Sequence, residues 1–167
     1  LSEYEKLFDS VSNEKAIGEG SVSYLFYPDT PLKIKECLPE VKIIIMLRDP
    51  LSRVFSHYLM DHRLGLVDIS YDAIVSQDSE HEKQHLYYQQ YVELGLYYKQ
   101  VKRYFDVFGR QSVKIYLQED LQNNPDKVIR DLYGFLDIDH SYNPDLSRKH
   151  NVFSMPKNKL IHKLYAV

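Results

Sequence analysis

The sequence predicts an α/β protein with a parallel sheet flanked by helices, and two observations support this prediction. Residues 41–47 (Val-Lys-Ile-Ile-Ile-Met-Leu) form a short, β-branched run that is apolar on both faces, as is typical of a central parallel strand covered on both sides. Stretches with helical spacing of apolar residues separate this run from another strand at residues 112–117. The 167 residues suffice for a single domain, 1–167, with a substantial core.

The junction after the strand at residues 41–47 carries helix signals. Asp49 is a good N-cap and Pro50 a good first helical residue, so a helix is expected to begin there. Apolar side chains at helical spacing continue to about residue 64, and Gly65 is a typical stop. The sequence therefore predicts a strand, a short loop and a helix in direct succession.

The other elements follow from the same periodicities, three to four residues for helices and two for strands. We expect, in chain order, a short helix at 2–8, a short strand at 15–19, a helical turn within 21–27, a helix at 29–37, helical pieces within 68–90, a long helix at 91–108, a helix at 124–136 and a short closing helix at 160–165. The sheet thus has three expected strands, and residues 137–159 are expected to be irregular.

Composition limits the kinds of ligand. The net charge is −3, so no general attraction to nucleic acid or to a membrane surface is expected, and an anion must be held by a local cluster of donors. The single cysteine, Cys37, is interpreted as a small buried hydrophobic residue, and no apolar run reaches membrane-spanning length. The chain opens on Leu1 in a helix-like pattern, from which we expect a fragment of a longer protein.

Arg48 and Ser56 are the candidate anion-binding residues. Arg48 leaves the carboxyl end of the predicted strand, where open α/β sheets bind ligands, and the N-terminus of the next helix attracts phosphate. The Arg48 guanidinium can grip phosphate with a rigid fork, and Ser56 lies two turns into the helix, where it can face a ligand alongside. The alternative is structural: an ordinary N-cap with a first-turn ion pair to Arg53, and a Ser56 hydroxyl bonded to a backbone carbonyl.

The block at residues 48–58 (Arg-Asp-Pro-Leu-Ser-Arg-Val-Phe-Ser-His-Tyr) follows an apolar strand and resembles a segment of a known family. It is similar to the 3′-phosphate-binding segment of sulfotransferases that use PAPS (3′-phosphoadenosine 5′-phosphosulfate), particularly the carbohydrate and heparan sulfate type and their bacterial relatives. The resemblance implies that Arg48 and Ser56 bind the 3′-phosphate of PAPS, and that the first helix turn, including Arg53, supports the loop. It also implies the P-loop NTPase-like sulfotransferase fold.

Four further segments resemble the family in the same order, so the resemblance covers nearly the whole chain. They are Ile-Gly-Glu-Gly-Ser-Val-Ser-Tyr-Leu at 17–25, the helix-like stretch 95–108, the stretch 118–136 with its Glu-Asp-Leu, Asn-Pro and Phe-Leu, and Lys-His-Asn to Ser-Met-Pro-Lys at 149–157. The last segment resembles the loop that closes over the cofactor, which makes His150, Asn151 and Lys157 expected cofactor contacts.

The sequence departs from the family in one respect: it contains no Lys-x-Gly-Thr-(Thr/Ser) loop, the family's binding site for the 5′-phosphosulfate. That loop also carries the lysine that assists transfer. The transfer lysine and the catalytic base are therefore expected upstream of Leu1, together with the strand that leads into the loop. If the chain is complete, transfer is expected to be badly impaired, because the reacting end of the donor lacks its electrostatic stabilisation.

The main hypothesis is metal-free transfer of a sulfuryl group from PAPS to a hydroxyl or amine of an acceptor such as a glycan, a glycolipid or a small molecule. The expected compartment is the cytoplasm for a bacterial protein and the Golgi lumen for an animal one. The first alternative is a non-catalytic nucleotide-binding or interaction module that has lost the transfer loop. The second, a P-loop kinase-like phosphotransferase, requires a Walker-type loop that the sequence lacks.

Two pairs with histidine stand at i,i+4 spacing, His57 with Asp61 and His81 with His85. The second pair is half of a metal site without an evident third ligand. A solvated polar helix face is the simpler interpretation of such pairs.

Overall fold

The computed structural model of the chain describes residues 3 and 6–146. The described residues contain a parallel two-stranded sheet of β1 (Ile43–Leu47) and β2 (Val113–Leu117), in which Ile45 pairs with Ile115. The helices are α2 (Thr30–Cys37), α3 (Pro50–Leu64), α4 (Tyr71–Ser76), α5 (Gln84–Tyr91), α6 (Tyr97–Phe108), α7 (Gln118–Asn123) and α8 (Pro125–Leu136). Short 3-10 turns are η1 (Lys6–Phe8), η2 (Glu93–Gly95) and η3 (Arg110–Ser112).

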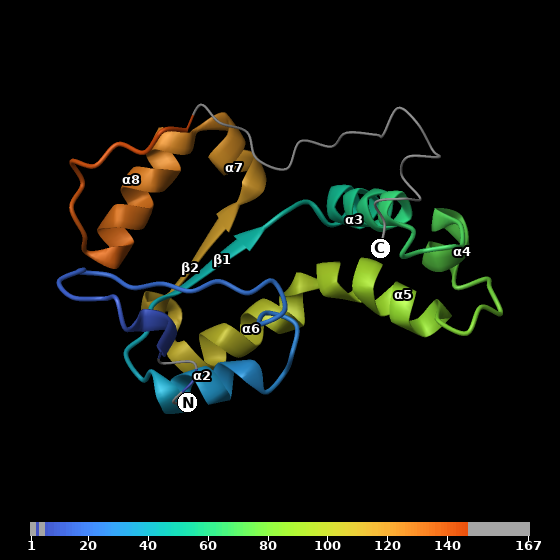
Figure 1. Ribbon diagram of the computed structural model, residues 1–167, viewed down its shortest axis with the longest axis horizontal. Helices are drawn as coiled ribbons and strands as arrows, with labels where there is room; N and C mark the ends of the chain where they lie inside the picture. Colours follow the sequence, from blue (N-terminus) through green and yellow to red (C-terminus); the bar gives the residue numbers. More distant parts are fainter. Residues whose placement is uncertain (1–2, 4–5, 147–167) are drawn as a thin grey trace.

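Helices lie on both sides of the sheet, as predicted. In Figure 1, α2 and α6 run along one side of the strands, and α7 and α8 along the other. Helices α3, α4 and α5 form a group beyond the carboxyl end of β1. The chain therefore presents the carboxyl ends of both strands toward the same region, from which α3 and α7 begin.

Two clusters of buried side chains stabilise these two parts. One cluster joins the sheet to α6 through Ile45, Val113, Tyr104 and Phe108. The other lies within the α3–α5 group and consists of Val54, Val67, Ile74, Tyr87 and Tyr91. The apolar positions of α6 fall at helical spacing, so one stripe of this amphipathic helix faces the core.

The predicted strand at residues 15–19 is wrong, so the described sheet has two strands and not three. This segment is exposed, and Ile17, its largest apolar side chain, is 56% exposed. A strand needs an apolar face to pack against the core, and a single isoleucine among Lys15, Gly18 and Glu19 does not supply one.

The predicted long helix at residues 91–108 is interrupted. Helix α5 ends at Tyr91, the turn η2 follows, and α6 begins only at Tyr97. The buried amide of Gln100 donates to the carbonyls of Glu93, Leu94 and Leu96 at 3.0, 3.4 and 3.2 Å, which satisfies the backbone of the turn. The break thus depends on a side chain that lies beyond it in the sequence. Helix α7 was not predicted either.

The expectation that the first strand is covered on both faces is wrong for the described residues. Ile45 is 6% exposed, whereas Ile44 and Met46, on the opposite face of β1, are 42% and 47% exposed. Cys37, expected to be buried, is exposed at the end of α2. Among the described residues, no helix is long and apolar enough to cross a membrane.

Candidate functional site

The strand–loop–helix unit has the predicted cap. The Asp49 carboxylate accepts a 2.8 Å hydrogen bond from the main-chain N–H of Ser52, and Pro50 occupies the first turn of α3. This hydrogen bond is the main reason that the pKa of Asp49 is lowered. Gly65 ends the helix in the left-handed conformation, with φ 71°. The local signals in the sequence therefore define α3 at both ends.

Most main-chain N–H groups of the loop before α3 already have acceptors. The N–H of Arg48 faces the Tyr97 hydroxyl, where it opposes the burial that raises the pKa of Tyr97. The N–H of Asp49 donates to Glu119 Oε1 at 3.2 Å. The Ser52 N–H is capped by Asp49, and Pro50 has no N–H. Few N–H groups at the start of α3 therefore remain free to donate to a phosphate. An anion here must be bound mainly by side chains.

Arg48 and Ser56 supply such side chains. Arg48 directly follows the last residue of β1, Leu47, at the carboxyl edge of the sheet, and Ser56 lies in the second turn of α3. Both residues are half-buried. Neither side chain is hydrogen-bonded to another described residue, so the alternative in which the Ser56 hydroxyl bonds a backbone carbonyl receives no support there.

Arg53 has a structural position. Its guanidinium donates to the main-chain carbonyls of Tyr91 and Gln90 at 2.9 and 3.1 Å and so ties α3 to the end of α5. Burial lowers the pKa of Arg53, which remains charged because an arginine pKa starts above 12. The suggested first-turn ion pair to Asp49 is replaced by this fork, and Arg53 acts as a support for the unit that carries Arg48.

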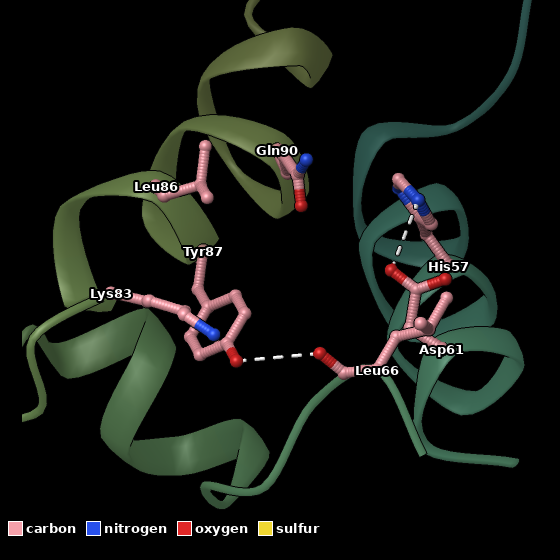
Figure 2. A pocket seen from close by; sticks show the side chains of 7 residues that line it. All are labelled: His57, Asp61, Leu66, Lys83, Leu86, Tyr87 and Gln90. Atoms are coloured by element: carbon pink, nitrogen blue, oxygen red, sulfur yellow. Dashed lines mark hydrogen bonds and ion pairs between the residues drawn. The ribbon is translucent and has the colours of Figure 1, made fainter. Parts of the chain in front are cut away.

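A pocket of about 430 Å³ lies between α3 and α5. Figure 2 shows His57 and Asp61 on α3 facing α5, with Leu66 on the connecting loop. The complete lining is His57, Asp61, Leu66, Lys83, Leu86, Tyr87 and Gln90. The hydroxyl of Tyr87 closes one end by donating to the carbonyl of Leu66 at 3.3 Å.

The polar groups of this pocket are largely engaged with one another. His57 Nε2 is 3.4 Å from the carboxylate of Asp61, which also accepts a 2.7 Å hydrogen bond from Tyr91. Burial lowers the pKa of His57, and the Asp61 carboxylate opposes this effect. Asp61 is 8% exposed, so the interpretation of this pair as a solvated helix face is wrong.

The second histidine pair does not share a helix. His81 precedes α5 and lies 3.2 Å from Asp68, while His85 is exposed in the first turn of α5. In the described part of the chain, no cluster of three His, Cys, Asp or Glu side chains is arranged to hold a metal ion.

Sequence reasoning missed Glu119 and Tyr97 as partners of the loop. Both fall in stretches that resemble the family, 95–108 and 118–136. A signal existed, because Glu119 lies two residues after β2 and the carboxyl ends of neighbouring parallel strands meet at one edge. Tyr97 and Tyr98 line a second cavity of about 570 Å³ beside Leu47. His150, Asn151 and Lys157 lie outside the described residues.

The sulfotransferase domain family matches residues 25–165. A crystal structure of a sulfotransferase from Alicyclobacillus acidocaldarius is 39% identical, with a TM-score of 0.76 over 89% of this chain and 60% of that one. The bifunctional heparan sulfate N-deacetylase/N-sulfotransferase 1 of Caenorhabditis briggsae is 23% identical over 73% of this chain and 15% of that protein. The membrane-associated sulfotransferase kil1 of Dictyostelium discoideum is 28% identical over 46% of this chain and 18% of that protein.

The chain thus spans less than a fifth of these two curated relatives and 60% of the solved chain. The family match extends across the strand–loop–helix unit and most of the remaining chain. The chain shares its α/β architecture, a parallel sheet flanked by helices, with the solved sulfotransferase. The chain belongs to the sulfotransferase domain family.

Proposed function

We propose that this chain is part of an enzyme that transfers a sulfuryl group from PAPS to a hydroxyl or amine acceptor, and that it holds the 3′-phosphate of the donor. The observation that carries this proposal is the placement of Arg48. Its guanidinium leaves the carboxyl edge of β1 without a hydrogen bond to another described residue, beside a loop in which most N–H groups already have acceptors. A planar fork in that position suits a phosphate dianion.

The residues of the chain contribute binding and orientation. Arg48 and the Ser56 hydroxyl donate to the 3′-phosphate, while Arg53 keeps α3 fixed against α5. His150, Asn151 and Lys157 are proposed to close over the nucleotide. Transfer itself is an in-line displacement: the acceptor oxygen or nitrogen bonds to sulfur, the bond from sulfur to the bridging phosphate oxygen breaks, adenosine 3′,5′-bisphosphate leaves, and the acceptor's proton passes to a base.

The transfer lysine, the base and their strand are proposed to lie outside these 167 residues, in the same domain. The uncovered face of β1 supports this proposal, since Ile44 and Met46 are apolar and more than two-fifths exposed in a sheet whose other face is packed. For the acceptor we propose a glycan in the first place, because the Caenorhabditis briggsae relative is named for heparan sulfate. A glycolipid and a small molecule are the next candidates.

A nucleotide competition assay on the full-length protein tests the donor proposal. Wild-type protein is expected to prefer adenosine 3′,5′-bisphosphate to AMP, and Arg48→Ala is expected to reduce affinity for the bisphosphate about tenfold or more, because a charged hydrogen bond contributes roughly 1.5–3 kcal/mol. Ser56→Ala should reduce it less. AMP affinity should not change in either variant.

The matched control is Arg130→Ala, which removes an exposed arginine of α8 far along the chain from the loop. It is expected to bind both nucleotides as the wild type does. The donor assignment is wrong if Arg48→Ala keeps the full preference for the bisphosphate, or if Arg130→Ala loses it to the same extent.

The sequence also favours a second candidate, a module that binds the nucleotide without transferring the sulfuryl group, because no Lys-x-Gly-Thr loop occurs in the 167 residues. The two candidates differ in one measurement. The full-length protein is incubated with PAPS radiolabelled in its sulfuryl group and a panel of glycans. An enzyme transfers the label to a glycan, whereas a binding module only retains labelled PAPS.

A further inference from the structure

The carboxylate of Glu119 contacts the loop that carries Arg48. Its Oε1 accepts a hydrogen bond from the main-chain N–H of Asp49 at 3.2 Å, between residues 70 positions apart in the sequence. Glu119 is the second residue of α7, which begins directly after β2, and Asp49 is the cap of α3, which begins after β1. The contact therefore links the two segments that leave the carboxyl ends of the paired strands.

This hydrogen bond holds the peptide group between Arg48 and Asp49. A peptide group is planar, so fixing its N–H direction also fixes the carbonyl of Arg48 on the other side of the bond. The peptide group before Arg48 has a neighbour as well, because its N–H faces the Tyr97 hydroxyl at the start of α6. The two peptide planes on either side of an α-carbon determine where its side chain points.

The two partners, Tyr97 and Glu119, lie in elements that are packed independently of the loop. Tyr97 begins α6, whose far end lies in the core with Tyr104 and Phe108. Glu119 follows β2, whose residues pair with β1 along their whole length. The loop is thus held from two sides, and neither contact uses the guanidinium of Arg48.

We propose that Glu119 is a positioning residue that aims the Arg48 side chain at the 3′-phosphate of the donor. The inference rests on the proposed function, because it assigns Arg48 to that phosphate. Glu119 itself does not touch the nucleotide. Its negative charge disfavours a nearby phosphate, so its presence beside the loop is explained by the hydrogen bond that it accepts and not by its charge.

Two variants of Glu119 distinguish the effect of its acceptor oxygen from the effect of its charge. In Glu119→Gln an amide oxygen can still accept from Asp49, whereas in Glu119→Ala no acceptor remains. The matched control is Asp120→Ala, which removes the next acidic side chain of the same turn, exposed and without a hydrogen bond to the loop. Tyr97→Phe is a second test, because it removes the acceptor on the other side of Arg48.

The experiment measures the affinities of the full-length protein for adenosine 3′,5′-bisphosphate and for AMP, after thermal unfolding has shown which variants are folded. Glu119→Ala is expected to weaken the bisphosphate about five- to tenfold, the equivalent of one lost hydrogen bond, and to leave AMP unchanged. Glu119→Gln and Asp120→Ala are expected to bind both nucleotides as tightly as the wild type or, through loss of negative charge, slightly tighter. Tyr97→Phe is expected to repeat the selective loss.

Equal weakening of both nucleotides in Glu119→Ala would overturn the inference, because a general structural defect does not distinguish the 3′-phosphate. Unchanged or tighter bisphosphate binding in Glu119→Ala, or a Glu119→Gln variant as weak as Glu119→Ala, overturns it too. The Arg48→Ala variant in the same assay separates the two levels. If Arg48→Ala keeps the preference for the bisphosphate, the proposed function fails; if it loses the preference and Glu119→Ala does not, only the role of Glu119 fails.

Discussion

The Tyr91 hydroxyl donates a 2.7 Å hydrogen bond to the carboxylate of Asp61, and it does so inside the core. Tyr91 is 1% exposed and Asp61 is 8% exposed. Their contact joins Tyr91, the last residue of α5, to the fourth turn of α3, and Arg53 in the first turn of α3 bonds the carbonyl of the same Tyr91. The helix that carries Ser56 is therefore held to its neighbour by two charged groups, one acidic and one basic.

Tyr91→Phe is expected to lower the free energy of unfolding by about 1.5–3 kcal/mol, because a buried carboxylate loses a short hydrogen bond. Tyr104→Phe is the matched control, since the Tyr104 hydroxyl donates at 2.8 Å to a neutral acceptor, the carbonyl of Tyr24. For the control we expect a loss of about 0.5–1.5 kcal/mol. Urea unfolding measures both losses, and equal values would contradict a special contribution from the charge of Asp61.

The free energy of unfolding is expected to depend on pH through His57. Burial lowers the pKa of His57 below its usual 6.5, with Asp61 opposing the shift. As the pH falls through 6.5, the unfolded chain binds this proton first, so the free energy of unfolding decreases from there down to the folded-state pKa. Above this window the neutral imidazole contributes no pH dependence.

His57→Gln is expected to remove this part of the acid loss, so that its free energy of unfolding falls less steeply than that of the wild type below about pH 6.5. The measurement is a series of urea unfolding curves across that range. His85→Gln, at an exposed position of α5, tests whether the loss of any histidine has the same effect. A His57→Gln profile that runs parallel to the wild type would show that His57 is not the titrating group.

The strand–loop–helix unit was predictable because every signal in it is local. A β-branched run, an N-cap, a proline and a terminal glycine each act within a few residues, and β1 and α3 have the expected bounds to within two residues. The interruption before α6 was not predictable in the same way, because it depends on Gln100 satisfying carbonyls of the preceding turn. Helical spacing alone continues through that segment without a break.

In the candidate site, too, the local features were predictable from the sequence and the long-range contacts were not. Arg48 and Ser56 could be named from spacing and resemblance, because both lie within one continuous segment. The contact of Glu119 with the loop could not, since it joins residues 70 positions apart and depends on the pairing of β1 with β2. The burial of Asp61 was missed for a similar reason: its partner Tyr91 lies 30 positions away on another helix.

Gly109 is expected to be intolerant of any side chain. It ends α6 at φ 76° and ψ 159°, a region that essentially only glycine adopts, so the backbone itself disfavours any side chain. Gly109→Ala should lower the free energy of unfolding by about 1–3 kcal/mol. Gly65, at φ 71° and ψ 18° with nothing within 4 Å of its Cβ position, provides the comparison.

Gly65→Asn places a residue that tolerates the left-handed region at the end of α3, so a loss below about 1 kcal/mol is expected. Gly109→Asn is expected to be as damaging as Gly109→Ala, because asparagine is no better suited to the extended, positive-φ region. Urea unfolding of the four variants checks the ranking. Similar losses for the two asparagine variants would contradict it.

Arg53→Lys is expected to separate support of the site from contact with the nucleotide. A lysine keeps the charge but lacks the planar fork that reaches the carbonyls of Tyr91 and Gln90 together, so we expect a loss of about 1–2 kcal/mol in the free energy of unfolding. The ratio of affinities for adenosine 3′,5′-bisphosphate and AMP should stay at its wild-type value. Arg48→Ala should have the opposite effect: the free energy of unfolding stays almost unchanged, and the preference for the bisphosphate over AMP is lost. Urea unfolding and nucleotide competition on the same two variants make the comparison. A changed ratio in a stable Arg53→Lys protein would contradict the expectation that Arg53 only stabilises the packing of α3 on α5.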